Sequence, residues 1–466
     1  MALEKKLKRR DFLLKAGCVV FGFLFFLFGI ISFPSLQESL GVGYGPLIED
    51  PAKIMDLPEG FSYKIIARSG EQMMDGFYTP GHPDGMGTFE GPDGSTIILR
   101  NHENFPEYLP GFGPFGPANE LVSRLSGRLI YDRGREGGPP LGAVTTLVYD
   151  TKAQELRTQF LSLAGTLVNC SGGVTPWNSW ISCEEIFQNP SFILAKKHGY
   201  VFEIPASPEQ KVVKPVPLKA MGRFVHESIA VDPQTNIIYM TEDQLDGLVY
   251  RFLPNRPGHL EEGGRLQCLV IDSQPKMDTR NWDIQRVKQG ERLPVSWIDL
   301  EKVDPKKDDL RIRGHEKGGA LFASGEGMEY LEGMVYFSCT NGGRIKAGQI
   351  WRYVPNPSEL TEEKSESPGQ LELLFEVTDR AVLENPDQMI GTPWGDLFVC
   401  EDGFGQQYLV GVTSRGETYR FAHNAKDESE FTGVCFSPDG GTMFVNYQDA
   451  GYTFAVMGPW KTKLGG

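Results

Sequence analysis

Basic residues are scarce in this chain relative to acids. The 466 residues include 46 Lys and Arg against 61 Asp and Glu, which gives a formal net charge of -15. A nucleic-acid-binding surface needs a basic patch, so this composition argues against nucleic acid as a partner. An acidic surface suits hard cations such as calcium, although most surface acids simply face water.

Cysteine is also rare, with seven residues in the chain. Cys183, Cys339 and Cys400 each end an apolar run, in SWISC, VYFSC and DLFVC. Residues at such positions are more often small buried hydrophobes than disulfide partners, so we expect no disulfide framework. Cys170 differs, because it follows GTLVN and precedes Ser-Gly-Gly, a turn at the start of a strand.

The N-terminus carries the features of a targeting segment. Arg9 and Arg10 precede an apolar run from about Cys18 to Phe33. We interpret residues 1–35 as a twin-arginine export signal, which predicts a periplasmic or extracellular location. The alternative is an ordinary anchor that tethers the protein to the membrane and keeps its basic flank inside.

The rest of the chain has the composition of a β protein. Its 55 Gly and 32 Pro are spread along the sequence, which favours many short strands joined by turns over long helices. A hydrophobic content of 40% is sufficient to bury a large core. We therefore assign residues 36–56 to a linker and residues 57–466 to one all-β catalytic domain, which we expect to be a monomer.

Six segments repeat one plan: a turn, a short apolar β run and a cluster of acids or amides. They are GPDGSTIILRNHEN, TPWNSWISCEE, DPQTNIIYMTED, YLEGMVYFSCTN, TPWGDLFVCED and SPDGGTMFVNYQD. Such repetition is typical of propeller blades, whereas the units of a Greek-key sandwich would not repeat in order. The sequence predicts a six-bladed β-propeller in which an early strand within Leu57 to Arg68 closes the ring against the C-terminal blade.

A second series of residues lies upstream of each run and carries chemistry. It consists of Asp84 with Met86, Cys170, His226 with Glu227, Glu326, Asp387 and Glu430. The innermost strand of each blade begins near the central channel, so this series would meet at one axis. The pairs Glu184-Glu185, Glu242-Asp243 and Glu401-Asp402 would reach loops at one face. Converging carboxylates repel one another unless cations neutralise them, so we predict a metal cluster, with calcium on the carboxylates and a transition metal such as iron on the thiolate of Cys170.

Four blocks of the chain resemble the PhoX-type alkaline phosphatases. They are NCSGGVTPWNSWISCEE, FVHESIAVDPQTNIIYMTED, NPDQMIGTPWGDLFVCEDG and FTGVCFSPDGGTMFVNYQDAGYTFAVMGPW, and the resemblance runs from about Leu57 to Trp460. It implies a six-bladed propeller with a cluster of ferric iron and calcium. It further implies that an oxide bridging the metals attacks the phosphorus of a small phosphate monoester.

The same resemblance implies a set of metal ligands. It makes Cys170 an iron ligand, and it assigns metal-binding carboxylates to Glu184, Glu227, Glu242, Asp243, Glu326, Asp387 and Glu401.

One position departs from the family pattern. The family has an arginine two residues before the glutamate that matches Glu326, where it would hold the phosphate through two hydrogen bonds, and this chain has Ser324. Arg344 is a candidate for that contact, or else an exposed turn residue. Three functions stay open: a phosphatase, another calcium-dependent propeller hydrolase such as a lactonase or phosphotriesterase, and a noncatalytic propeller that binds a metal or a partner.

Overall fold

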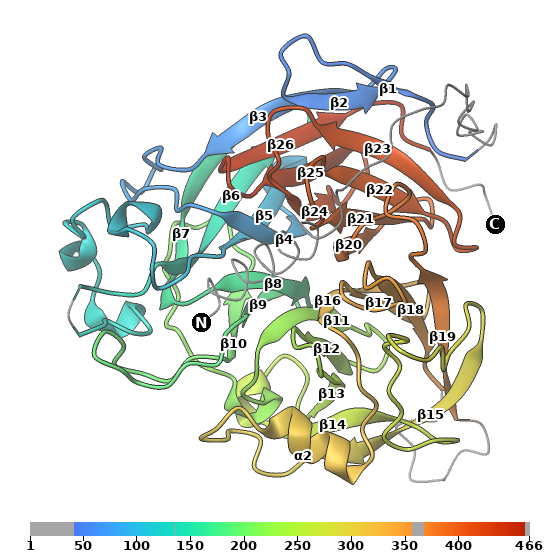
Figure 1. Cartoon of the computed structure of the whole chain (residues 1–466). Helices are drawn as coiled ribbons and strands as arrows, with labels where there is room; N and C mark the ends of the chain where they lie inside the picture. The colour runs from blue at the N-terminus through green and yellow to red at the C-terminus, as the bar shows by residue number, and fades with distance from the viewer. Residues whose placement is uncertain (1–41, 136, 357–367, 462–466) are drawn as a thin grey trace, which may run out of the picture.

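The computed structural model describes residues 42–461 except residue 136 and residues 357–367. These residues fold into antiparallel sheets arranged around one central axis (Figure 1). The described residues contain a single α-helix, α2 (Leu310–Lys317). The prediction of an all-β, propeller-like fold is therefore confirmed.

The inner strands, one from each repeat, contact one another in a ring, and Figure 1 shows them nearest to the axis. They are β4 (Pro83–Glu90), β8 (Asn169–Val174), β11 (His226–Val231), β16 (Gly325–Leu331), β20 (Pro386–Gly391) and β24 (Phe431–Phe436). Each inner strand is followed along the chain by a second strand, and these are β5 (Thr96–His102), β9 (Ser179–Glu184), β12 (Ile238–Glu242), β17 (Met334–Cys339), β21 (Leu397–Glu401) and β25 (Thr442–Tyr447).

The remaining strands complete the sheets farther from the axis. They are β1 (Leu47–Ile48), β2 (Met55–Pro58), β3 (Ser62–Arg68), β6 (Gly142–Asp150), β7 (Glu155–Thr166), β10 (Val201–Pro205), β13 (Val249–Pro254), β14 (Gly264–Ile271), β15 (Arg292–Asp299), β18 (Gln349–Val354), β19 (Gly369–Glu376), β22 (Tyr408–Val412), β23 (Thr418–Asn424) and β26 (Tyr452–Met457). Six short 3-10 helices lie in the described loops, at Pro92–Gly94, Pro110–Phe112, Val122–Arg124, Gly127–Leu129, Lys219–Met221 and Leu260–Glu262.

Hydrogen bonding joins the strands into five sheets, not the six separate blades that the repeats predicted. Four of the sheets each contain one inner strand, and the fifth has nine strands in the order β11-β12-β13-β14-β15-β19-β18-β17-β16. The difference arises from β15, which pairs antiparallel with β14 on one side and with β19 on the other. This strand lies in the long insert between the third and fourth repeats, and it joins two units that would otherwise be separate.

The ring closes through an early strand, as predicted. β3 pairs antiparallel with β26, with Ile65 opposite Phe454 and Arg68 opposite Tyr452. β2, which contains Leu57, pairs instead with β23 in the neighbouring sheet. The start of the described chain is thus hydrogen-bonded to its end, which ties the ring together.

The hydrophobic core lies between neighbouring sheets rather than at one centre. One cluster combines Phe398 and Phe421 of the β20 sheet with Val445 and Phe454 of the β24 sheet. Cys183, Cys339 and Cys400 are fully buried in such clusters, and all six cysteines of the described region are free thiols. The expectation that these three residues act as small buried hydrophobes is confirmed.

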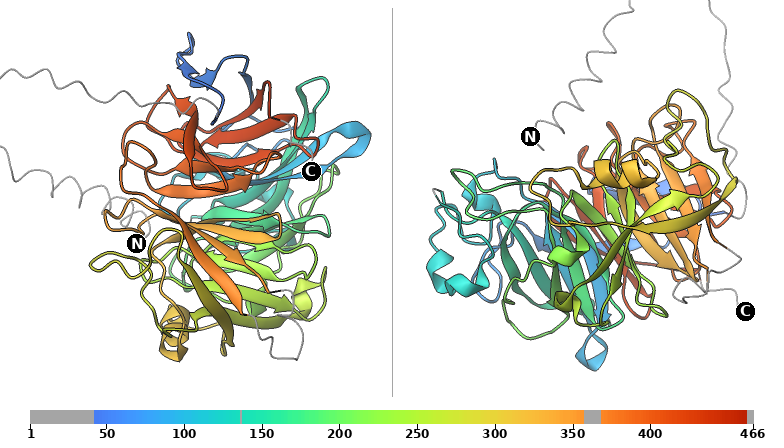
Figure 2. Two further views of the ribbon diagram at one scale, coloured as in Figure 1. Left: turned by 90° about the vertical axis from the view of Figure 1, so that its right-hand side faces the viewer. Right: turned by 90° about the horizontal axis from the view of Figure 1, so that it is seen from below.

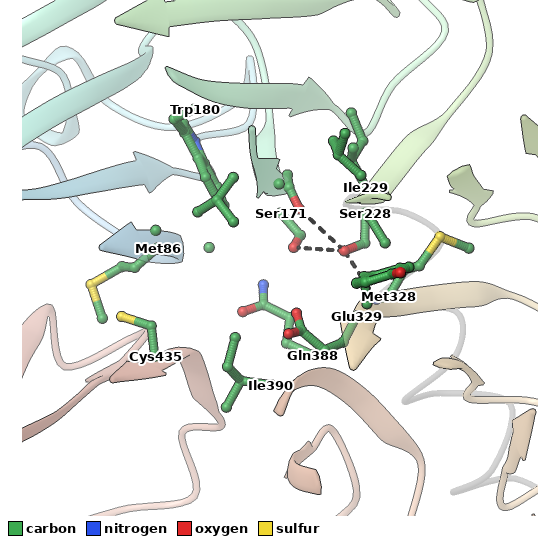
Figure 3. Close-up of a pocket in the computed structure, with 18 of the residues that line it drawn as sticks. Met86, Ser171, Trp180, Ser228, Ile229, Met328, Glu329, Gln388, Ile390 and Cys435 are labelled. Atoms are coloured by element: carbon green, nitrogen blue, oxygen red, sulfur yellow. Dashed lines mark hydrogen bonds between the residues drawn. The ribbon is translucent and has the colours of Figure 1, made fainter. Parts of the chain in front are cut away.

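The ring has two distinct faces. Figure 2 shows α2 on one face and the β4–β5 turn on the opposite face. The inner strands begin at the α2 face and end at turns on the opposite face, and they enclose a cavity of about 380 Å³ along the channel (Figure 3).

The predicted export signal cannot be compared with the structure, because residues 1–41 lie outside the described residues. Of the predicted linker, residues 47–48 form β1 and residues 55–56 begin β2, so part of it is built into the β20 sheet. None of the described helices is long and apolar enough to cross a membrane.

Candidate metal centre

Five inner strands begin with the same irregularity. In β4, β8, β11, β16 and β20 the pairing with the second strand shifts by one residue directly after the first pair. A β-bulge of this kind redirects the side chains of the bulged strand. The residue that follows the first pair is Asp84, Cys170, Glu227, Glu326 or Asp387. In β24 the shift comes one position later, after Thr432, and Glu430 lies before the strand.

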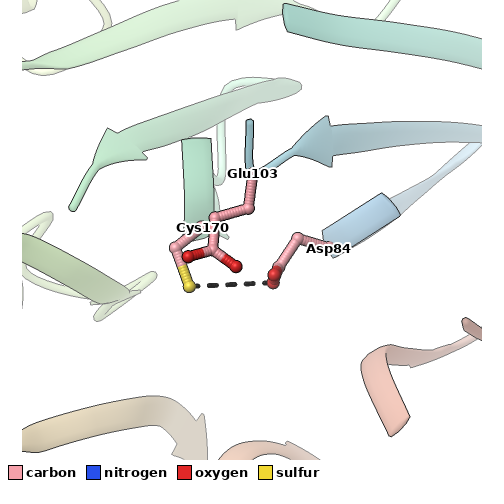
Figure 4. Close-up of side chains that lie close together, drawn as sticks. All are labelled: Asp84, Glu103 and Cys170. Atoms are coloured by element: carbon pink, nitrogen blue, oxygen red, sulfur yellow. Dashed lines mark hydrogen bonds between the residues drawn. The ribbon is translucent and has the colours of Figure 1, made fainter. Parts of the chain in front are cut away.

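These five residues converge on the channel axis at the α2 face. Cys170 Sγ lies 3.1 Å from Glu227 Oε1 and 3.7 Å from Asp84 Oδ1, as Figure 4 shows for Asp84. Three overlapping groups of possible ligand atoms, each within 4.8 Å of one another, run through the cluster. The groups are Asp84, Glu103 and Cys170; Cys170, Glu185 and Glu227; and Glu227, Glu326 and Asp387.

Two further acids enter the cluster from second strands. Glu103 follows His102, which pairs with Pro83, and Glu185 follows Glu184, which pairs with Asn169. Each therefore lies one residue beyond the end of its strand, beside the bulge of its own inner strand. Seven anionic or potentially anionic side chains thus meet in one place.

The electrostatics of the cluster favour protons or cations. Burial raises the pKa of Cys170 well above its usual range, and the acidic neighbours Asp84 and Glu227 add to that rise. Burial together with Glu326, Glu185 and Asp387 likewise raises the pKa of Glu227. Glu227 Oε2 is buried and has no hydrogen-bond partner among the described residues, so it is available to a cation. A donor set of one thiol and several carboxylates fits a mixed site for calcium and a transition metal.

Neutral side chains hold the acids in place. Gln448 Nε2 donates to Asp84 Oδ2 at 2.6 Å and to Glu103 Oε2 at 2.7 Å. Gln388 Nε2 also donates to Asp84, and Thr340 Oγ1 donates to Glu326 Oε1 at 2.7 Å. Such contacts fix the orientation of candidate ligands without adding charge.

The backbone of the bulges is fixed by neighbouring units. Asn101 Nδ2 donates to the carbonyl of Cys170 at 3.0 Å, and Thr241 Oγ1 donates to that of Glu326. Ser338 donates an equivalent hydrogen bond to the Asp387 carbonyl, and Asn446 donates one to the Asp84 carbonyl. Both donors occupy the last position but one of a second strand. In four places, therefore, one unit positions the candidate ligand of the next.

Four residues of the predicted ligand set do not join the cluster, and they are Glu184, Glu242, Asp243 and Glu401. Glu184 accepts hydrogen bonds from His198 Nδ1 at 2.6 Å and from the backbone N–H groups of Leu167, Gly199 and Tyr200. Glu242 accepts from Tyr250 Oη and the Leu248 N–H, and Glu401 from the Glu384 and Tyr408 N–H groups. Successive side chains of a strand face opposite sides, so the first acid of each pair holds the neighbouring loops and is directed away from the axis.

The structure also places the other predicted residues. Asp243 and Asp402 follow β12 and β21 at positions equivalent to Glu185, but neither belongs to the three groups of close ligand atoms. Arg344 is exposed in a turn, as the simpler interpretation had it. Ser324 is buried, has a positive φ of 52°, and its Oγ accepts a hydrogen bond from Asn341 Nδ2 at 3.0 Å.

The cluster contains residues that the predicted ligand set omitted. Asp84 stood in the upstream series, and Glu185 in an acidic pair, but neither was assigned as a ligand, and Glu103 was not singled out at all. Glu103 and Glu185 share the position directly after the second strand of their unit, since β5 ends at His102 and β9 ends at Glu184.

Comparison with known proteins gives one family and one fold. The sequence model of the alkaline phosphatase PhoX family matches residues 42–110 and 138–451. The structure of Pseudomonas fluorescens PhoX in complex with vanadate, a transition state analogue, is similar with a TM-score of 0.65 and 18% sequence identity, over 87% of this chain and 96% of that chain. At this identity the likeness shows the fold alone.

Other similarities are weaker. A gluconolactonase from Xanthomonas campestris has a TM-score of 0.39 and 11% identity, over 90% of this chain and 99% of that chain, which is too distant to support an argument. No curated protein sequence matches the chain significantly.

His198 is buried between Glu184, at 2.6 Å, and Asp132, at 3.3 Å, and this group predicts that the protein loses stability at alkaline pH. Burial would lower the pKa of His198, but Glu184 and Asp132 raise it from 6.5 to about 9. This raised pKa stabilises the fold fully below pH 6.5, and the contribution is lost as the pH rises through 9. We expect His198→Gln to lower the free energy of unfolding by roughly 3 kcal/mol at acidic pH and by much less above the folded pKa. Urea denaturation of both proteins across the pH range measures this difference, and parallel curves would contradict it.

Adjacent acids Glu184 and Glu185 provide a matched pair of variants. Glu185→Gln should lower the metal content of the purified protein and change the unfolding free energy by less than about 1 kcal/mol, because Glu185 faces the cluster. Glu184→Gln should lower the unfolding free energy by about 3 kcal/mol or more, because it removes the charge that pairs with buried His198. Elemental analysis and urea denaturation measure the two effects. Equal metal loss in both variants would show that the cluster is wrongly assigned.

Proposed function

The chain belongs to the PhoX alkaline phosphatase family, and on that premise we propose that it is a metal-dependent phosphatase that hydrolyses small phosphate monoesters. The observation that carries the proposal is the meeting of seven potential anionic ligands at the channel axis. Such a concentration of buried acid is costly unless cations neutralise it. The same cations would attract a phosphate group.

We propose calcium and ferric iron as the cations. Carboxylate oxygens are preferred by calcium, and a thiolate such as that of Cys170 is preferred by a transition metal. When bound, the cluster would supply Lewis-acid charge for the phosphate oxygens and the leaving alkoxide, and a bridging oxide as the attacking oxygen.

The residues of the chain prepare this centre in two ways. Without metal, Cys170 Sγ holds a proton that it donates to Glu227 Oε1, and binding a cation requires the loss of that proton. Gln448 and Thr340 fix the carboxylates of Asp84 and Glu326 from the side. Their amide and hydroxyl groups orient the ligands and cost no additional charge.

The presence of serine rather than arginine at position 324 supports a second candidate function. Its hydroxyl, bound to Asn341, cannot supply the charge that an arginine would give to a phosphate. A calcium-dependent lactonase or phosphotriesterase would use the same centre without that arginine, so this class is the alternative to phosphomonoester hydrolysis. Arg344 remains the candidate phosphate contact from within the same unit.

Three further proposals concern the whole protein. We propose that the nine-stranded sheet represents two blades joined by β15, so that the propeller has six blades. We propose that residues 1–35 direct export by the twin-arginine route, to the periplasm or beyond, or tether the protein to the membrane. Residues 57–466 would then act as one monomeric catalytic domain.

The metal requirement predicts a specific response to chelation and to loss of the thiol. Hydrolysis of p-nitrophenyl phosphate should cease when calcium is chelated and return when calcium is restored. Cys170→Ala should lose any visible thiolate-to-metal absorption and most activity, whereas Cys400→Ala, a variant of a core cysteine, should keep both. Absorption spectra and initial rates measure the outcome, and identical spectra for the two variants would refute the role of Cys170.

The departure at Ser324 predicts a gain of function. Ser324→Arg should raise kcat/KM for p-nitrophenyl phosphate by roughly a hundredfold, which corresponds to a few kcal/mol of transition-state stabilisation by a bidentate contact. Ser324→Gln is the matched control, because it has a long side chain without charge. Steady-state kinetics measure both variants. If the arginine variant folds but stays at the parental rate while the parent cleaves lactones or phosphotriesters, the second candidate function replaces the first.

A further inference from the structure

The channel contains a second compartment that the metal centre does not use. The cavity of about 380 Å³ is lined by none of the seven cluster side chains. Gln388 lies between the two: its Nε2 donates to Asp84 and its Oε1 accepts from the Gly433 N–H at 2.5 Å. The buried Gln388 side chain is therefore fixed at both ends, and it separates the acids at the α2 face from the cavity beyond them.

The cavity opens on the face opposite to α2. Thr175, Pro176 and Pro233, from the turns that follow β8 and β11, line its outer end. Val174, which also lines it, is 47% exposed. A ligand could thus enter without passing the candidate metal centre.

The wall of the cavity is mainly apolar. Met86, Trp180, Ile229, Met328, Ile390 and Phe436 line it, and Figure 3 shows Trp180, Ile229 and Ile390 around the central space. Its volume falls in the range of small-molecule sites, which are typically apolar with a few polar groups. A molecule held here would need a compact apolar body.

Among the residues that the structure describes, Glu329 is the only carboxylate that lines the cavity, and Figure 3 shows its side chain directed into the space. Burial raises the pKa of Glu329 to about 8, and a hydrogen bond from the Gly391 backbone only partly offsets that rise. No cationic side chain among the described residues pairs with it. An apolar cavity with one unpaired acid is complementary to a ligand that carries a single positive charge.

We propose that this cavity binds a small primary ammonium compound with an apolar body, held by a charge-assisted hydrogen bond from the ammonium group to Glu329. A divalent metal ion needs several oxygen ligands, and the cavity offers one carboxylate. The aromatic and aliphatic wall suits an aryl or alkyl body.

The test is a calorimetric titration of the metal-loaded full-length protein at about pH 8.5, where Glu329, with its pKa raised to about 8, is mostly ionised. Benzylamine, which is cationic at that pH, should bind saturably with a one-to-one stoichiometry. Benzyl alcohol is the matched uncharged probe, and it should bind at least about tenfold more weakly because it lacks the charge. Glu329→Gln should weaken benzylamine binding by a similar factor. Glu332→Gln, in the exposed turn after the same strand, is the control and should bind as the parent does.

Several outcomes would overturn the proposal. The first is that benzylamine does not bind saturably. The second is that benzylamine and benzyl alcohol bind with equal affinity. The third is that Glu329→Gln binds benzylamine as tightly as the parent protein does. Because the readout is binding, the result does not depend on whether the metal centre hydrolyses phosphate esters. As a second variant, Ile390→Trp should fill the cavity and abolish binding while Glu329 stays in place. Retained affinity in a folded Ile390→Trp protein would also contradict this location.

Discussion

The burial of many acids around one axis is the constraint on which the rest of this structure depends. Cys170 and Glu227 lie 3.1 Å apart, within a group of seven potential ligands. In a medium of low polarity, like charges at such distances cannot all be ionised without cations. The fold must therefore hold these groups against their own repulsion until protons or metal ions neutralise them, and the closed ring of sheets provides the required rigidity.

The contacts that hold the acids in place come from all parts of the ring. A bulge at the start of five inner strands directs one side chain of each toward the axis. The carbonyl groups of Asp84, Cys170, Glu326 and Asp387 each accept a side-chain hydrogen bond from a neighbouring unit. Closure of β3 on β26 completes the ring. A change in one unit is consequently felt at the ligand of the next.

The channel has a different chemistry at its two ends. The α2 face carries the acid cluster, and the opposite face opens to an apolar cavity in which Glu329 is the one carboxylate from the described part of the chain. Gln388 lies at the boundary and contributes to both, since its amide is bonded to Asp84 and it lines the cavity. The same inner strands thus provide the acid cluster where they begin and the lining of the cavity along the rest of their length.

The sequence by itself determined the all-β class, the repeated units, the closing strand and the buried cysteines, because short apolar runs and turns are local patterns that specify strands directly. It also predicted that Cys170, Glu227, Glu326 and Asp387 would meet at one axis, and the structure brings these four side chains into one cluster. The structure alone decided that Glu185, not Glu184, faces the cluster, that Glu103 joins it, and that β15 merges two units into one sheet. The reason is that a shift of one residue reverses the direction of a strand side chain, and that pairing and bulge register depend on contacts between segments far apart in the chain.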